Sequence, residues 1–285
     1  MGLSEKMERL EAVRKRAEIG ISVGVLGVLV FLIPIFWPKM IFGFLGIGMI
    51  AFGVIYAKGT KEAYQKLYKE LFAEEPLRAN FENVFYAWRT GFDEPTVKSF
   101  QLCEMGNRFK SEDYLRATYK GINFEMSDVT VQYHSSNGKS SSTVTYFRGR
   151  MFAFDCPANL YSSTRIYSRR FHYRGRNNTQ KDQKVEMESV RFNEEFDIYS
   201  NNPHDVFYLL TPQYMEYMET MLRKYPELSI HFNGNKLLIG INEPEKDVFD
   251  KKDWLNETVY PDEMEKIQRD IDDIKSVIEM FFITE

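Results

Sequence analysis

The distribution of apolar residues is most uneven near the N-terminus. Residues 19–57 contain a single charged residue, Lys39, and are otherwise almost entirely apolar or small. Two segments, 19–37 and 40–57, are each close to the ~20 residues that a helix needs to cross the ~30 Å hydrocarbon core of a bilayer. Only Pro38 and Lys39 separate them, so the second helix must return antiparallel to the first. The pattern predicts a transmembrane helical hairpin.

Basic residues flank both open ends of this hairpin, whereas its outer turn carries Lys39 alone. Cytoplasmic loops carry an excess of Lys and Arg, so both termini are expected in the cytoplasm. A cleaved signal peptide is the alternative, but no small-residue cleavage site follows the first apolar run and a second run comes at once. The flanking basic residues are Lys6, Arg9, Arg14, Lys15 and Arg16 before the hairpin, and Lys58, Lys61, Lys66 and Lys69 after it.

Glycines mark one flank of each predicted membrane helix. In lipid, small residues let helix backbones approach closely. We therefore expect the two helices to pack on each other through these positions, with a homo-oligomer formed through the same faces as the alternative. The glycines are Gly20, Gly24, Gly43, Gly46 and Gly53.

The polar remainder divides into three segments. Residues 1–18 are predicted to form a cytoplasmic amphipathic helix. Residues 58–96 form a juxtamembrane helical segment that Pro76 interrupts, with a further helical piece over residues 79–88. Residues 97–285 form a cytoplasmic domain.

Within that domain, residues 97–200 show the short alternating apolar runs that are typical of strands. Polar turns separate the runs, and residues 136–139 are expected at the tip of a hairpin. Asn233-Gly234, between two apolar runs, is a strong hairpin sequence. These segments predict an antiparallel sheet.

Helices are predicted on both sides of the last hairpin. Residues 203–224 should form a helix that is broken near Pro212, because the residue before a proline disfavours helical geometry. Residues 261–282 carry apolar side chains at three-four spacing and should form the last helix. The predicted fold class is α+β: a two-helix hairpin followed by an antiparallel sheet with flanking helices.

Net charge excludes one class of partner. Residues 58–285 contain 31 basic and 37 acidic residues. Domains that bind nucleic acid are usually basic, so no nucleic-acid partner is expected.

One segment departs from this acidic balance. Seven basic residues lie between positions 165 and 184, against one acid, Asp182, and aromatic residues are interleaved with them. Beside a membrane such a cluster is expected to contact anionic lipid headgroups, each cation contributing about 1 kcal/mol. A solvated turn is the equal alternative, and RNA binding is a third that the net charge weakens. This basic patch consists of Arg165, Arg169, Arg170, Arg174, Arg176, Lys181 and Lys184.

No pattern in the sequence predicts a catalytic residue, a metal or a cofactor. Cys103 and Cys156 lack the spacing of a metal or redox motif and are expected as reduced thiols, with one bridge between them as the alternative. The histidines show no zinc-binding spacing. They stand at positions 134, 172, 204 and 231.

Three stretches of the domain, residues 106–115, 119–129 and 146–152, resemble a bacterial membrane-protein family known as domain of unknown function 3137. Residues 207–212, Phe-Tyr-Leu-Leu-Thr-Pro, extend the resemblance. The family implies the layout described above and a bacterial cell membrane. Because its members are often encoded beside LemA-type membrane proteins, it also suggests a LemA-type partner.

Together these features predict a membrane-anchored cytoplasmic binding or scaffold module at the bacterial inner membrane. Its expected contacts are anionic lipid headgroups or another membrane protein. The alternative is a membrane-tethered, hydrolase-like enzyme. That alternative requires a concave pocket that gathers titratable groups.

Overall fold

The computed structural model describes residues 3–36, 40–138, 140–173, 182–244, 249, 254–256 and 260–282. The chain forms two compact units: Met1–Ala79 with Phe249–Ile271, and Asn80–Val248 with Asp272–Glu285. The last helix, α8 (Tyr260–Phe282), contributes its first half to one unit and its second half to the other. The predicted hairpin turn at residues 37–39 lies outside the described residues.

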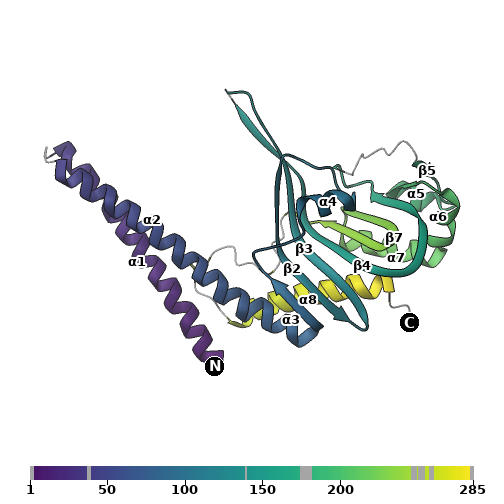
Figure 1. Ribbon diagram of the computed structural model, residues 1–285, viewed down its shortest axis with the longest axis horizontal. Coiled ribbons are helices and arrows are strands. Elements are labelled where there is room, and N and C mark those ends of the chain that lie inside the picture. The colour runs from purple at the N-terminus through teal and green to yellow at the C-terminus, as the bar shows by residue number, and fades with distance from the viewer. Residues whose placement is uncertain are drawn as a thin grey trace. The chain divides into compact units, whose positions relative to one another are not determined.

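The first unit is built on two long helices, α1 (Leu3–Phe36) and α2 (Met40–Lys69), which run side by side (Figure 1). They are antiparallel, because Gly20 faces Gly53 whereas Phe31 faces Gly46. Both helices are long and apolar enough to cross a membrane. Tyr68 and Phe72 extend the packing of this unit to the first half of α8, where Tyr68 donates a hydrogen bond to Glu263.

The helix continues past Lys69 and does not stop at Pro76. A short π-helical turn, η1 (Glu70–Glu74), leads into α3 (Glu75–Asn80), and the Glu75 N–H bonds to Glu70 O. Proline has no N–H to donate and clashes with the preceding turn, so the wider π turn accommodates the irregularity that Pro76 causes.

The helical piece predicted over residues 79–88 is wrong. Residues 79 and 80 end α3, and the next residues form the strand β1 (Glu82–Ala87), in which Phe85 pairs with Arg116 and Tyr86 with Leu115. Asn83 has a φ of 52°, which a helix does not accept. Pairing with a distant strand decides this segment, and local propensity does not.

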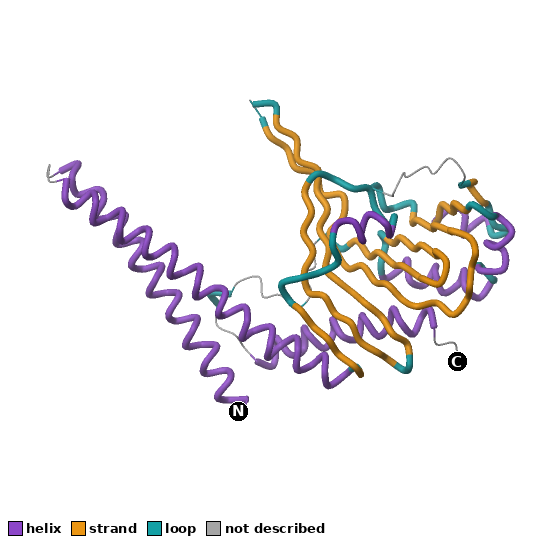
Figure 2. The backbone as a smooth tube through the Cα atoms, viewed as in Figure 1, coloured by secondary structure: helices purple, strands orange, loops and turns teal. Residues whose placement is uncertain are grey.

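The second unit contains a seven-stranded antiparallel sheet in the order β1-β2-β3-β4-β6-β5, with β7 paired to β4. Helices flank it, so the predicted α+β class is confirmed (Figure 2). The predicted hairpin tip at residues 136–139 is also confirmed, because Ser136 pairs with Ser141 across it. The remaining strands are β2 (Arg108–Tyr119), β3 (Ile122–Ser136), β4 (Ser141–Ser168), β5 (Gln183–Val185), β6 (Phe196–Ser200) and β7 (Leu228–Asn242).

Strands β4 and β7 form two nested bends, visible in Figures 1 and 2. β7 folds back at Asn233-Gly234: the Asn242 N–H donates to Glu227 O at 2.9 Å, and Gly234 has a φ of 62°. The predicted hairpin is therefore confirmed. β4 curves around it, so that its residues 149–155 pair with one arm of β7 and its residues 163–167 with the other.

Short helices interrupt the region that was predicted as strands throughout. α4 (Glu94–Phe100) begins where the Asp93 carboxylate accepts the Thr96 N–H at 2.8 Å, and α5 (Val190–Glu195) begins at Ser189 in the same manner. Helices of six or seven residues are too short to show a three-four period. The predicted break at Pro212 is confirmed, since α6 (Pro203–Leu209) ends before it and α7 (Pro212–Lys224) follows.

Apolar side chains cover both faces of the sheet. On one face, Val97 and Phe100 of α4 pack with Val129 and Met151 of the sheet. On the other, Phe154 lies with its ring centroid 5.0 Å from that of Phe282 in the second half of α8. The α4 face is only partly covered, and the uncovered part carries the pocket described next.

Candidate functional site

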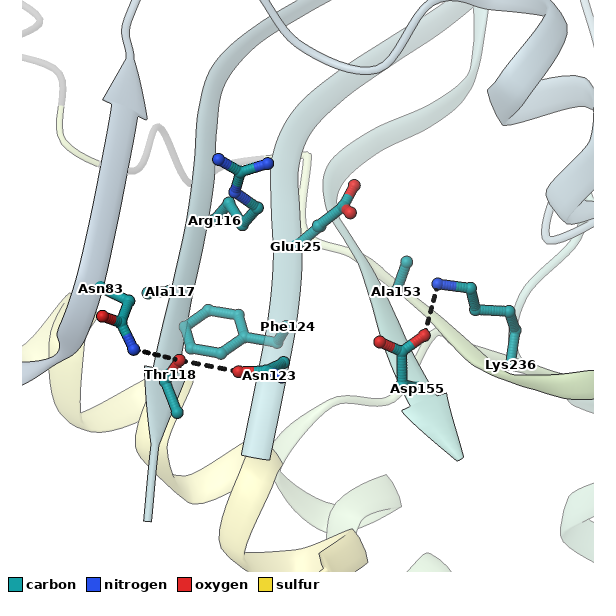
Figure 3. Close-up of a pocket in the computed structure, with 10 residues that line it drawn as sticks. All are labelled: Asn83, Arg116, Ala117, Thr118, Asn123, Phe124, Glu125, Ala153, Asp155 and Lys236. Atoms are coloured by element: carbon teal, nitrogen blue, oxygen red, sulfur yellow. Dashed lines mark hydrogen bonds and ion pairs between the residues drawn. The ribbon is translucent and has the colours of Figure 1, made fainter. Parts of the chain in front are cut away.

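A pocket of about 260 Å³ lies in the sheet of the second unit (Figure 3). Strands β1, β2, β3, β4 and β7 all contribute to it, so residues from five separate parts of the chain converge there. The lining residues are Asn83, Arg116, Ala117, Thr118, Asn123, Phe124, Glu125, Ala153, Asp155 and Lys236.

The hollow exists because a small side chain lies among long ones. Strand register places Arg116 of β2, Glu125 of β3, Ala153 of β4 and Leu238 of β7 in one row across the sheet. Ala153 ends at its β-carbon, so the side chains on either side rise above it. It also belongs to the buried cluster under α4, which places the pocket beside that core.

One wall is a chain of neutral hydrogen bonds. Asn83 Nδ2 donates to Thr118 Oγ1 at 3.3 Å, and Thr118 donates onward to Asn123 Oδ1 at 2.7 Å (Figure 3). The left-handed backbone at Asn83 accompanies an irregular register between β1 and β2 and places its amide at the pocket.

The upper wall carries two opposite charges. The Arg116 guanidinium lies over the Phe85 ring, 5.5 Å from its centroid. Tyr114 lies close to Glu125, and burial together with the negative charge of this carboxylate raises the pKa of Tyr114 to about 12. Tyr114 therefore stays protonated at neutral pH.

The opposite wall is an ion pair. Lys236 on β7 and Asp155 on β4 are cross-strand partners, and their charged atoms lie 2.6 Å apart. Both side chains are substantially exposed, so the pair contributes at most about 1 kcal/mol to stability.

The pocket gathers the titratable groups that the enzyme alternative requires, but its geometry suits binding better. Asp155 is paired with Lys236, and the Thr118 hydroxyl already donates to Asn123. The lining residues thus offer charges and hydrogen-bond groups for a small polar ligand.

The sequence did not predict this pocket. Arg116 and Glu125 look like ordinary solvent-facing residues of alternating strands, and Asn83 lies in a segment predicted as helix. Alternation could have placed Glu125 and Ala153 on strand faces, but only the register brings them together.

The structure describes four of the seven basic-patch residues, and each has an acidic partner. Arg165 is 3% exposed and pairs with Asp182. Arg169 and Lys184 both lie 3.3 Å from Asp197, and Arg170 lies 3.5 Å from Glu195. Buried Arg165 is not available to lipid, and acidic neighbours offset much of the charge of the other three. Arg174, Arg176 and Lys181 lie outside the described residues.

The predicted glycines lie between α1 and α2, where a methyl group added at Gly24 or Gly43 would make only ordinary contact, at 3.8 and 3.9 Å. A methyl group added at Gly46 would meet Phe31 N at 2.5 Å, and one at Gly53 would meet the Gly24 α-carbon at 2.7 Å. Gly20 lies against Tyr56 in the same interface. Sequence reasoning missed Gly27, which packs equally closely against residues 46–50 of α2.

Cys103 is a free, buried thiol, and burial raises its pKa to about 12. The side chain of Cys156 lies outside what the structure describes. Among the described residues, no cluster of three or more His, Cys, Asp or Glu could hold a metal ion.

One serine–histidine contact exists away from the pocket. His231 Nε2 lies 2.7 Å from Ser163 Oγ, and His231 Nδ1 lies 2.8 Å from Phe100 O. Burial lowers the pKa of His231 to about 4. Its ring is therefore neutral at pH 7 and a weak base, which favours a role in holding the α4 region on β7 over activation of Ser163.

Fold and pocket define an α+β protein in which a long apolar helical hairpin precedes an antiparallel sheet with a polar pocket. Residues 145–282 match the family described as protein of unknown function (DUF3137). This match confirms the resemblance that the sequence showed.

Other comparisons add little. None of the curated proteins matches the chain. The crystal structure of the mycobacterial trehalose monomycolate transport factor A, TtfA, aligns with 78% of this chain and 97% of its own, at 9% sequence identity and a TM-score of 0.40. A likeness at that level carries no argument about the function of this chain.

Proposed function

We propose that the protein is an integral membrane protein whose α1–α2 hairpin crosses the bilayer and anchors a ligand-binding module. The exposed apolar surface of the hairpin carries this proposal. Ile41, Phe44 and Ile55 are each at least 72% exposed, and apolar side chains surround both helices outside their glycine interface. Water-soluble proteins rarely expose contiguous apolar patches of this kind, whereas lipid accepts them.

The distribution of basic residues supports a cytoplasmic location for both termini. Basic residues lie on α1 before its apolar stretch and on α2 after its own, at the open end of the hairpin. The proposed setting is the bacterial inner membrane.

The binding part of the proposal rests on the pocket. The pairing of Arg169, Arg170 and Lys184 with acids reduces the support for the basic patch as a lipid-contacting surface. The pocket, by contrast, presents an Arg and a Glu close together in an open hollow. A LemA-type partner and a homo-oligomer stay predictions.

The anchor is tested by membrane fractionation of the full-length protein. Wild-type protein should remain with membranes after alkaline carbonate extraction, and a protease added outside spheroplasts should leave the sheet unit intact. Phe44→Lys should lower the membrane-retained fraction, because a lysine costs about 2.5–3.5 kcal/mol at the centre of a span and part of that cost at position 44, one turn inside the end of its span. Phe207→Lys, at a half-exposed position on α6, is the matched control and should change nothing. Soluble full-length protein would refute the anchor.

A further inference from the structure

We infer that the pocket binds a zwitterionic group, in which an ammonium and an anion are joined by a short linker. This inference rests on the proposed function, because it names the ligand class of the binding module. It is carried by the arrangement of Arg116, Glu125 and Ala153.

Arg116 supplies the site for the anion. The Phe85 ring covers one face of its guanidinium, which leaves the N–H groups at the edge of the guanidinium to donate. A phosphate or carboxylate oxygen accepts such bonds in a charge-assisted geometry.

Glu125 supplies the site for the ammonium. Its carboxylate lies close to Tyr114, and an ionised carboxylate accepts hydrogen bonds from an ammonium with either of its oxygens. Arg116 and Glu125 are cross-strand partners. Within the part of the chain that the structure describes, however, no ion pair joins their side chains (Figure 3). Each charge is therefore available to a ligand.

The close approach of these two charges selects the ligand. Side chains of cross-strand partners start about 5 Å apart, so an anion bound at Arg116 lies near the negative charge of Glu125. A simple anion or a simple cation meets repulsion from one of the two, whereas a zwitterion satisfies both. Lys236 and Asp155 add one charge of each sign, so the lining is neutral overall.

Ala153 supplies the space. The linker between the two charges lies over its methyl group, and the Asn83, Thr118 and Asn123 wall offers hydrogen bonds to a neighbouring hydroxyl or ester. A larger side chain at position 153 would fill the hollow.

Two sources share this chemistry: the phosphoethanolamine headgroup of a phospholipid, and a free zwitterion such as an amino acid. We would first titrate full-length protein, reconstituted in phosphatidylglycerol nanodiscs, by calorimetry with phosphoethanolamine, inorganic phosphate, ethanolamine and glycine. A zwitterion should bind at least about tenfold more tightly than either phosphate or ethanolamine, a difference of about 1.4 kcal/mol.

Variants separate the two charges. Arg116→Gln should weaken phosphoethanolamine binding by about tenfold and strengthen ethanolamine binding, because it removes the charge that repels the ammonium. Glu125→Gln should likewise weaken phosphoethanolamine binding by about tenfold, but it should strengthen phosphate binding. Ala153→Leu should abolish binding of all four ligands. Lys110→Gln and Glu112→Gln make the same charge changes on β2 outside the pocket and should bind as wild type does.

A second reconstitution, in nanodiscs that contain phosphatidylethanolamine, distinguishes the sources. Weaker binding of free phosphoethanolamine by the wild type there than in phosphatidylglycerol nanodiscs would show that the lipid headgroup occupies the pocket. Equal binding of glycine in both bilayers would show a free zwitterion. Equal affinity for zwitterion, phosphate and ethanolamine, or unaltered zwitterion binding in Ala153→Leu, would overturn the inference. If the proposed membrane anchor were wrong, the membrane fractionation would show it, whereas these titrations would not be affected.

Discussion

Arg150 on β4 is the most instructive residue to replace, because it is a fully buried cation. Its exposed fraction is 0%, its Nη2 pairs with Glu243 and lies 3.8 Å from Asp273, and its guanidinium lies 5.9 Å from the Tyr225 ring centroid. Asp273 also pairs with Lys224 at 2.8 Å. Burial acts to lower the pKa of Arg150, but Glu243 and Asp273 outweigh it and raise this pKa, so Arg150 remains charged inside the second unit.

Arg150→Met should destabilise the second unit by about 3–5 kcal/mol, since breaking a buried ion pair leaves an uncompensated charge. The lower end is expected, because Arg150 Nε and Nη1 have no hydrogen-bond partner among the described residues and removing them relieves a cost. Arg150→Met combined with Glu243→Gln should recover at least about 1 kcal/mol, because the second change removes the orphaned carboxylate charge.

Hydrogen exchange of β4 amides in the full-length protein, in non-ionic detergent with increasing urea, measures this unit alone. Arg191→Met is the matched control, because it removes the ion pair of a 67% exposed arginine with Glu219 and should cost at most about 1 kcal/mol. Two results would refute the conclusion that Arg150 and its buried carboxylate neighbours attract one another. One is a cost of Arg150→Met no greater than that of Arg191→Met, and the other is additivity of Arg150→Met and Glu243→Gln.

Two further predictions concern helix packing and pH. Gly46→Val should lower the thermal stability of the hairpin in detergent by about 1–3 kcal/mol, because its side chain would meet backbone atoms of α1, whereas Gly48→Val meets no atom within 4 Å and should be neutral. Burial lowers the pKa of His231 from its ordinary 6.5 to about 4. As the pH falls, the unfolded chain therefore binds a proton at this histidine before the folded chain does. The free energy of unfolding should decrease by on the order of 3 kcal/mol as the pH falls from 6.5 to 4. His231→Gln should flatten urea-midpoint curves across that window, and an unchanged slope would contradict this account.

Much of the helical architecture follows from local rules. Continuous apolar composition over residues 19–57 determines two long helices, and Pro212 determines the break between α6 and α7. Asn233-Gly234 determines a turn, because Gly adopts the required left-handed backbone at no steric cost. The family resemblance was also readable from short stretches.

Local rules failed where distant partners decide the outcome. Residues 82–87 became a strand because β2 offered an edge to pair with, and Arg165, which looked like part of an exposed basic surface, was buried against Asp182. No rule of composition distinguishes an arginine that faces lipid from one that meets a carboxylate seventeen residues further along.

The sequence by itself determined the anchor-like helices, their close-packing glycines, the turns and the α+β class, since each depends on residues that are neighbours along the chain. The tertiary structure alone decided the nesting of β7 inside β4, and with it the register that places Arg116, Glu125 and Ala153 in one row. A pocket of this kind is a property of strand register, and register is fixed by the packing of both faces of the whole sheet.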